Sequence, residues 1–104
     1  MYGLKQRDLD ALLHHLRRIR GIEQAWLFGS RAMGNYKVGS DIDIAVPGIN
    51  IDRDDLLHTI DLLNEEEPIP FFVEIVCFEE IDNPKLKDHI LTQGKLLLDN
   101  KAND

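Results

Sequence analysis

The chain has 104 residues, 43% of them hydrophobic, and a formal net charge of −7 at pH 7. This length fits one compact domain, which we expect to span residues 1–104. The acidic balance argues against direct binding of nucleic acid, because contacts to phosphate backbones depend on surfaces rich in Lys and Arg. No stretch approaches the roughly 20 apolar residues of a membrane span, and the N-terminus lacks the apolar core of a signal peptide. A cytoplasmic protein without a membrane partner is therefore expected.

Residues 9–19 carry apolar side chains at helical spacing, and Gly21 is placed to end that helix. His14 and His15 lie within it, but adjacent helical positions do not share a face, which favours surface histidines over a metal site. The basic run at residues 17–20 is expected to be a solvated helix end, where cations meet the helix dipole favourably.

The apolar run at residues 25–28 has the length of a strand and is followed by Gly29 and Ser30. Residues 31–33 can begin a helix, so this segment predicts a strand, a turn and a helix. Such a junction offers backbone N–H groups and the positive end of a helix dipole to an anion. Gly29 lets the backbone approach a phosphate, Ser30 adds a hydroxyl donor, and Arg31 could supply a bidentate contact. The turn is therefore a predicted phosphate site.

Asp41 and Asp43 open the next apolar strand, which ends before Pro47. Because side chains alternate along a strand, both carboxylates project from the same side. Two carboxylates about 4 Å apart repel by about 4 kcal/mol at an effective dielectric of about 20, and a cation between them removes this cost. Ligands that are all oxygens favour Mg²⁺ or Mn²⁺ over zinc, and Mg²⁺ completes its shell with water and substrate phosphates. A metal and a nucleotide are therefore predicted together.

A third acidic residue, Glu74, lies in the apolar strand predicted at residues 71–77. A lone charge in such a strand is costly to bury unless it is paired or bound to a metal. If this strand lies beside the one that carries Asp41 and Asp43, Glu74 completes a cluster of three carboxylates. Such a cluster can hold two metal ions, one activating an attacking hydroxyl and one stabilising a pyrophosphate leaving group.

The remaining segments complete an α/β or α+β order with a mixed sheet and helices packed mainly on one face. A helix begins after Asp52, a plausible cap, and the acidic run at residues 65–67 is expected to be a solvated face. The single Cys77 is expected to be a buried, inert thiol. A last helix precedes Gly94 and a closing strand, and residues 99–104 are expected to be a frayed tail.

The two motifs together resemble the nucleotidyltransferase superfamily related to DNA polymerase β. They read Gly-Ser-Arg-Ala-Met-Gly at residues 29–34 and Gly-Ser-Asp-Ile-Asp at residues 39–43. The short length and the first motif are similar to the minimal nucleotidyltransferase (MNT) branch over essentially the whole chain. The resemblance implies a polymerase β-like nucleotidyltransferase fold. It also implies a set of nucleotide-binding residues, which are Gly29, Ser30, Arg31, Gly39 and Ser40.

The same resemblance implies that Asp41, Asp43 and Glu74 are the catalytic and metal-binding carboxylates for two Mg²⁺ ions, with Mn²⁺ as a substitute. Asp is commoner than Glu at the third position. An extra methylene moves a carboxylate by about 1 Å or more, and misplacement of that size can lower a rate by about 100-fold. Metal binding by Glu74 is thus a firmer expectation than full activity.

In the MNT branch the usual companion is a HEPN-domain protein. The resemblance implies that the chain is an antitoxin that neutralises a HEPN ribonuclease toxin, in a hetero-oligomer, by transferring AMP from ATP to a tyrosine hydroxyl. An alternative stays open, in which a catalytically weak nucleotide-binding module masks the HEPN partner by stoichiometric binding. Transfer to an aminoglycoside is disfavoured, because no extra domain is present to hold the antibiotic.

Overall fold

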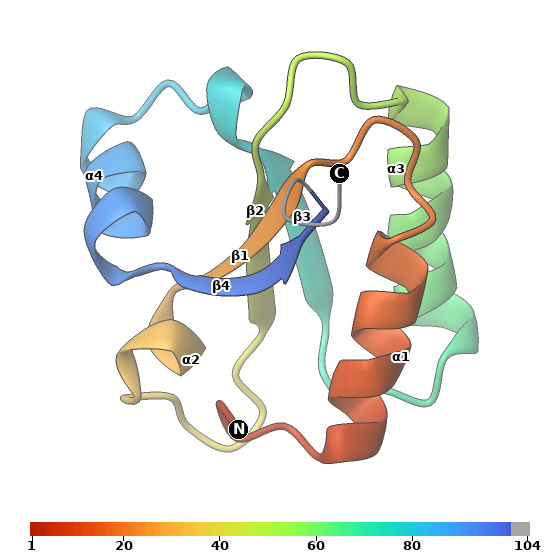
Figure 1. Ribbon diagram of the computed structural model, residues 1–104. Coiled ribbons are helices and arrows are strands. Elements are labelled where there is room, and N and C mark those ends of the chain that lie inside the picture. The colour runs from red at the N-terminus through yellow and green to blue at the C-terminus, as the bar shows by residue number, and fades with distance from the viewer. Residues whose placement is uncertain (101–104) are drawn as a thin grey trace.

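The protein, described here for residues 1–100 in a computed structural model, folds around a four-stranded mixed sheet (Figure 1). The strand order is β3-β2-β1-β4. The central strand β1 (Gln24–Phe28) pairs antiparallel with β2 (Ile42–Val46) and with β4 (Lys95–Asp99). The edge strand β3 (Val73–Cys77) pairs with β2 in parallel. The predicted α+β class and mixed sheet are confirmed.

Helices flank the sheet on both faces (Figure 1). On one face lie α1 (Gln6–Leu16) and α3 (Arg53–Asp61), the latter continued by the π-helical turn η1 (Leu62–Glu66). On the other face lie the single turn α2 (Ser30–Met33) and α4 (Pro84–Gln93). The short 3-10 turn η2 spans Phe78–Glu80. The sequence predicted helices mainly on one face, but the structure divides them: α1 and α3 cover the larger core, and α2 and α4 cover the opposite face.

The alternation of side chains along β1 divides the core between these two faces. Ala25 and Leu27 point into the larger core under α1 and α3, whereas Phe28 joins a smaller one under α4 with Ala45 and Ile90. Strand β2 is covered on both faces, so it has no polar, solvent-facing side. Its apolar residues are all buried: Ile42, Ile44, Ala45 and Val46. Only Asp43 interrupts this run.

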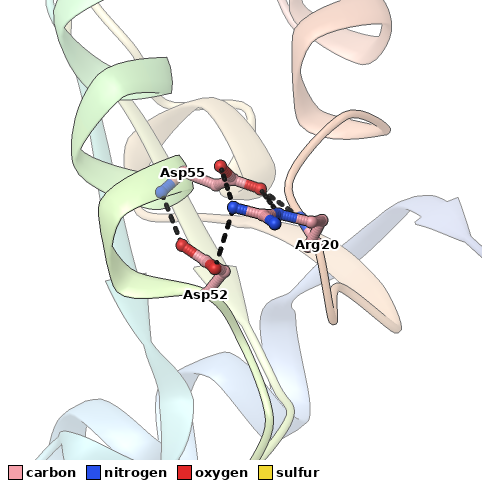
Figure 2. A network of polar contacts seen from close by, with 3 residues as sticks. All are labelled: Arg20, Asp52 and Asp55. Carbon is pink, nitrogen blue, oxygen red and sulfur yellow. Dashed lines mark hydrogen bonds and ion pairs between the residues drawn. The ribbon is translucent and has the colours of Figure 1, made fainter.

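Arg20 links the turn that follows α1 to the start of α3 (Figure 2). Its Nε lies 2.8 Å from Asp55 Oδ2, and its Nη2 lies 3.1 Å from Asp52 Oδ2. The Asp52 side chain also accepts from the Asp55 N–H at 2.9 Å, which confirms the predicted cap. The hydrogen bond from the Arg20 side chain lowers the pKa of Asp55 below its ordinary value. Arg20 is thus exposed but paired, which corrects its expected role as a purely solvated cation.

His15 also differs from its expected place on the surface. Its ring is only partly exposed, and its Nε2 lies 2.6 Å from Glu67 Oε1, just beyond η1. This contact joins α1 to the end of η1, which continues α3. Glu67 therefore does not belong to a freely solvated acidic face. His14 is exposed as predicted.

The segment that enters β3 is fixed by Asn64 in η1. Its side-chain amide donates to the Val73 carbonyl and its side-chain oxygen accepts from the Val73 N–H, each at 2.8 Å. This two-way contact fixes the first residue of β3, next to Glu74.

Near the C-terminus, Asp99 is part of β4, and the Asn100 N–H donates to the Glu23 carbonyl at 2.8 Å. The frayed tail therefore does not begin at Asp99, and its remainder, residues 101–104, lies outside the described residues.

None of the helices in residues 1–100 combines the length and the apolar character needed to cross a membrane.

Candidate active site

The turn between β1 and α2 requires glycine at its first position. Gly29 has φ +77° and ψ −156°, a backbone conformation that is essentially restricted to glycine. A Cβ atom on Gly29 would lie 2.7 Å from Asp43 Oδ2, so a side chain would collide with this carboxylate. The predicted phosphate turn and the Asp43 carboxylate are therefore in direct contact, without a side chain between them.

His89 belongs to this turn, although sequence reasoning did not identify it. The Gly29 N–H donates to His89 Nε2 at 2.9 Å, so this ring nitrogen is the acceptor. The ring also meets Phe28 edge-on, with centroids 6.3 Å apart. A lone histidine in α4 carries no motif, and only the packing of α4 on β1 brings it to the turn.

Asp43 and Glu74 lie side by side on neighbouring strands. Their Cα atoms are register partners in the parallel pair β2–β3, as the sequence predicted on the condition that these strands are neighbours. Burial raises the pKa of Asp43 above its ordinary value, and the charges of Glu74 and Asp41 and a hydrogen bond with Glu74 add to the increase. The charged form of Asp43 is therefore disfavoured here unless a cation balances it.

Asp41 lies outside this pair. It is exposed and precedes Ile42, the first residue of β2, so strand alternation does not fix the direction of its side chain. In residues 1–100, no three Asp, Glu, His or Cys side chains gather into a group that could hold a metal ion. The expected three-carboxylate cluster is therefore not assembled in advance, although the charge of Asp41 acts on Asp43.

The chemistry of these donors nevertheless fits Mg²⁺. Asp43 and Glu74 offer oxygen ligands alone, and Asp43 carries a charge that is poorly balanced by the protein. Mg²⁺ in proteins is commonly bound by one or two carboxylates together with water and substrate phosphates, rather than by a complete protein cage. The pair is sufficient for such a site.

Arg31 takes a different place from the expected phosphate contact. Only 2% of it is exposed. Its Nε and Nη2 donate to the Ser40 carbonyl at 3.0 and 2.7 Å, and its Nη1 donates to the Tyr2 carbonyl at 3.0 Å. The guanidinium carbon lies 4.1 Å from the centre of the Phe71 ring and 5.2 Å from that of Tyr36. The guanidinium donors that were expected to bind a phosphate are thus hydrogen-bonded to backbone carbonyls.

Gly39 and Ser40 close the turn that leads to Asp41. The Ser40 hydroxyl accepts from the Lys37 N–H at 2.9 Å, and the Ser40 N–H donates to the Lys37 carbonyl at 3.1 Å. Gly39 has φ +85°, and a Cβ atom there would meet nothing within 4 Å. Their geometry explains a tight turn, and their contact with a nucleotide stays a prediction.

Comparison with known proteins agrees with this arrangement. The family described as Polymerase beta, Nucleotidyltransferase matches residues 11–103. A crystal structure of a toxin–antitoxin with AMP-PNP contains a chain that is 26% identical, with a TM-score of 0.69, over 96% of this chain and 77% of that chain. A mutant of the toxin–antitoxin MntA–HpeT is 25% identical, with a TM-score of 0.67, over 97% and 77%.

A third structure, tri-AMPylated Shewanella oneidensis HEPN toxin in complex with MNT antitoxin, is 24% identical, with a TM-score of 0.67, over 97% of this chain and 77% of that chain. At this identity the likeness shows the fold. No curated protein matches the chain. Because the family match spans both motifs, all four strands and most of the chain, the protein belongs to the polymerase β nucleotidyltransferase family.

Proposed function

We propose that this protein is the MNT antitoxin of a HEPN–MNT pair and that it transfers AMP from ATP to a hydroxyl group of its HEPN partner. One observation carries the proposal: the Gly29 turn touches Asp43, and Asp43 lies opposite Glu74. A phosphate turn and paired carboxylates thus meet at one point of the sheet. The likeness to a toxin–antitoxin structure with AMP-PNP supports a nucleotide, and it supports a toxin as the partner.

Each group has a role in the proposed reaction. Gly29 and Ser30 bind the triphosphate in this proposal, and the absence of a side chain at Gly29 lets the turn lie directly against Asp43, so a phosphate on the turn lies near the metal-binding carboxylates. Asp41, Asp43 and Glu74 would hold two Mg²⁺ ions, which supply charge neutralisation and activation of a hydroxyl when bound. Mn²⁺ could take their place. Glu74 is exposed on the edge strand β3, so its carboxylate is accessible to an acceptor group of another molecule.

The bond changes are those of nucleotidyl transfer. The acceptor hydroxyl loses its proton to a carboxylate, for which Glu74 is the accessible candidate. Its oxygen forms a bond to the α-phosphorus of ATP, the bond from this phosphorus to the bridging oxygen breaks, and pyrophosphate leaves. The products are an adenylylated partner and pyrophosphate. The reaction uses ATP, which places the pair in the cytoplasm in this proposal.

The test is transfer of label from α-labelled ATP, with Mg²⁺, to the cognate HEPN-domain protein. Asp43→Asn removes a carboxylate of the pair, and we expect it to reduce the transfer rate by about 100-fold or more, the effect of removing a group that acts on the transition state. Asp82→Asn is the matched control, because Asp82 is an exposed aspartate in the loop before α4. Equal labelling with wild type and Asp43→Asn would contradict the proposal. So would a lack of labelling by a wild-type protein that binds ATP.

Stoichiometric masking of the HEPN partner is the second candidate function. Two observations favour it, namely Glu in place of the commoner Asp at position 74 and the absence of a preassembled three-carboxylate group in residues 1–100. The double variant Asp41→Asn/Asp43→Asn separates the two functions in an RNA-cleavage assay. A masking protein still inhibits the HEPN ribonuclease at equal concentration after this change, whereas a transferase does not.

A further inference from the structure

A buried arginine directly follows the phosphate turn and contacts each segment that leads to a carboxylate. Arg31 directly follows Ser30 and is only 2% exposed. Its side chain contacts three other segments of the chain: the loop before β2, the segment before β3 and the N-terminal turn. We infer that Arg31 is a positioning residue, which couples the phosphate turn to the placement of Asp41 and Glu74. Its catalytic consequence rests on the proposed function, whereas its structural consequence can be measured without it.

The contact with the loop before β2 uses two of the guanidinium donors. Nε and Nη2 of Arg31 donate to the same acceptor, the Ser40 carbonyl, at 3.0 and 2.7 Å. Charge-assisted hydrogen bonds from a planar guanidinium fix an acceptor in direction as well as in distance. The bonded carbonyl belongs to the peptide group that joins Ser40 to Asp41. Because Asp41 is exposed and precedes the strand, this anchor, together with the bond from the Ile42 N–H to the Phe72 carbonyl, limits where its carboxylate can go.

The contact with the segment before β3 uses the face of the guanidinium. Its central carbon lies 4.1 Å from the centre of the Phe71 ring, within the range of a cation–π interaction. Phe71 precedes β3, the strand that carries Glu74, and the carbonyl of the next residue, Phe72, accepts from the Ile42 N–H at 2.8 Å. Arg31 thus lies against the point where β2 and β3 begin to pair.

The third contact joins the N-terminal turn to the same group. Nη1 of Arg31 donates to the Tyr2 carbonyl at 3.0 Å, and the Tyr36 ring lies 5.2 Å from the guanidinium carbon. Gly3 has φ +74°, and a Cβ atom there would collide with the Tyr36 ring and lie 2.9 Å from Nη1. A methyl group at position 3 would therefore force the Tyr36 ring, and with it the guanidinium that the ring covers, to shift while the arginine itself is kept.

In this arrangement the donors of Arg31 are already engaged and are not free for a phosphate. A phosphate could reach the guanidinium only if the bonds to Ser40 and Tyr2 opened and the buried side chain became accessible. A positioning role and a phosphate contact then predict different results for Arg31→Lys. Lysine retains the positive charge that attracts a phosphate, but it loses the planar fork that holds one carbonyl with two donors.

The experiment compares wild type with Arg31→Lys and Gly3→Ala, and uses Arg17→Lys, a change at an exposed arginine, as the control. The first readout is hydrogen exchange of two amides near Asp41, those of Ser40 and Ile42, which donate to Lys37 and Phe72 carbonyls. We expect both variants to exchange at these amides about tenfold faster or more, because the anchor that resists local opening is lost. Exchange of the Gly94 amide, which donates to Ile90 at the end of α4, should not change.

The second readout is the kinetics of transfer to the HEPN partner. We expect Arg31→Lys to lower kcat by about tenfold or more and to leave KM for ATP within about threefold, as for a misplaced catalytic group. Unchanged exchange at Ser40 and Ile42 in Arg31→Lys would overturn the inference, as would a raised KM with an unchanged kcat.

The exchange experiment decides the inference even if wild-type protein transfers no label, so a failure of the proposed function is recognised separately. Should Arg31→Lys not fold, Gly3→Ala makes the same test with the arginine in place.

Discussion

The backbone N–H of Gly29 and the imidazole of His89 form a hydrogen bond of 2.9 Å that ties the phosphate turn to α4. The ring rests edge-on against Phe28, which joins Ala45 and Ile90 in the small core under α4. The turn is therefore held from two directions, since Arg31 anchors its far side to the loop before β2. Its position depends on residues far from it in the sequence.

Replacing His89 with Phe tests the contribution of this hydrogen bond. Phe retains the aromatic contact with Phe28 but leaves the partly buried Gly29 N–H without its acceptor, which we expect to cost about 1 kcal/mol in the free energy of unfolding. Urea denaturation measures the change. His14→Phe, at an exposed site on α1, is the control and should have little effect. Equal stability of the two variants would mean that water replaces the imidazole without loss.

Gly29 and Gly34 provide a matched pair of glycines at the two ends of α2. Both have positive φ, of +77° and +82°, but a Cβ atom at Gly34 would meet nothing within 4 Å, whereas at Gly29 it would lie 2.7 Å from Asp43 Oδ2. We expect Gly34→Ala to cost about 1 kcal/mol, the cost of a left-handed backbone alone. Gly29→Ala should cost about 1–3 kcal/mol more, from greater backbone strain and the collision with Asp43. Thermal or urea unfolding of both proteins gives the comparison, and equal losses would rule out a steric role of Asp43.

The sequence was sufficient for the fold class because its local signals agree with one another. Residues 25–28 and, apart from Asp43, residues 42–46 are apolar runs of strand length, and the glycine between β1 and α2 adopts a backbone conformation that other residues avoid. The position of Glu74 beside Asp43 followed from the assumption that their strands are neighbours, and the parallel register confirms this pairing. The spacing of the motifs could not predict that β2 and β3 pair, because this pairing depends on the path that α3 and η1 take between the two strands.

The same reasoning could not place Arg31 or His89 correctly. An arginine after a Gly-Ser turn has the right chemistry to bind a phosphate. Only the three-dimensional structure shows that the Arg31 guanidinium donates instead to the Ser40 and Tyr2 carbonyls. His89 reaches the turn only because α4 packs against β1. The positions of Arg31 and His89 depend on contacts between segments that are far apart in the sequence. The periodicity of apolar residues predicts which face of a strand or helix is buried, but not such contacts.

Cys77 is expected to react slowly with alkylating reagents. Burial raises the pKa of its thiol from an ordinary 9.0 to about 11, and a hydrogen bond with Glu80 and the charge of that residue add to the increase. Because the thiolate is the reactive form, labelling by iodoacetamide at about pH 8 should be about 100-fold slower in the folded protein than in urea. Glu80→Gln removes the nearby charge and should accelerate labelling. Equal rates in folded and unfolded protein would contradict this prediction.

Asp43 should make the metal-free protein less stable as the pH rises. Its pKa is raised in the folded state, first by burial and then by the charges of Glu74 and Asp41, so over the interval above its ordinary value of 3.8 the folded protein binds more protons than the unfolded chain. The free energy of unfolding therefore falls with increasing pH across that interval. We expect Asp43→Asn, measured with EDTA, to be more stable than wild type at neutral pH by about 0.2–1 kcal/mol, the cost of like charges on neighbouring strands.

This advantage of Asp43→Asn should disappear well below pH 3.8, where Asp43 is protonated in both the folded and the unfolded state. Urea denaturation at a series of pH values measures the difference, and Asp82→Asn controls for the removal of one negative charge from a chain of net charge −7. Added Mg²⁺ should then stabilise wild type and not Asp43→Asn, because a ligand that binds only the folded state raises its stability. If Asp43→Asn were less stable than wild type at neutral pH without metal, Asp43 would be a structural carboxylate, and the site would have to be sought elsewhere on the sheet.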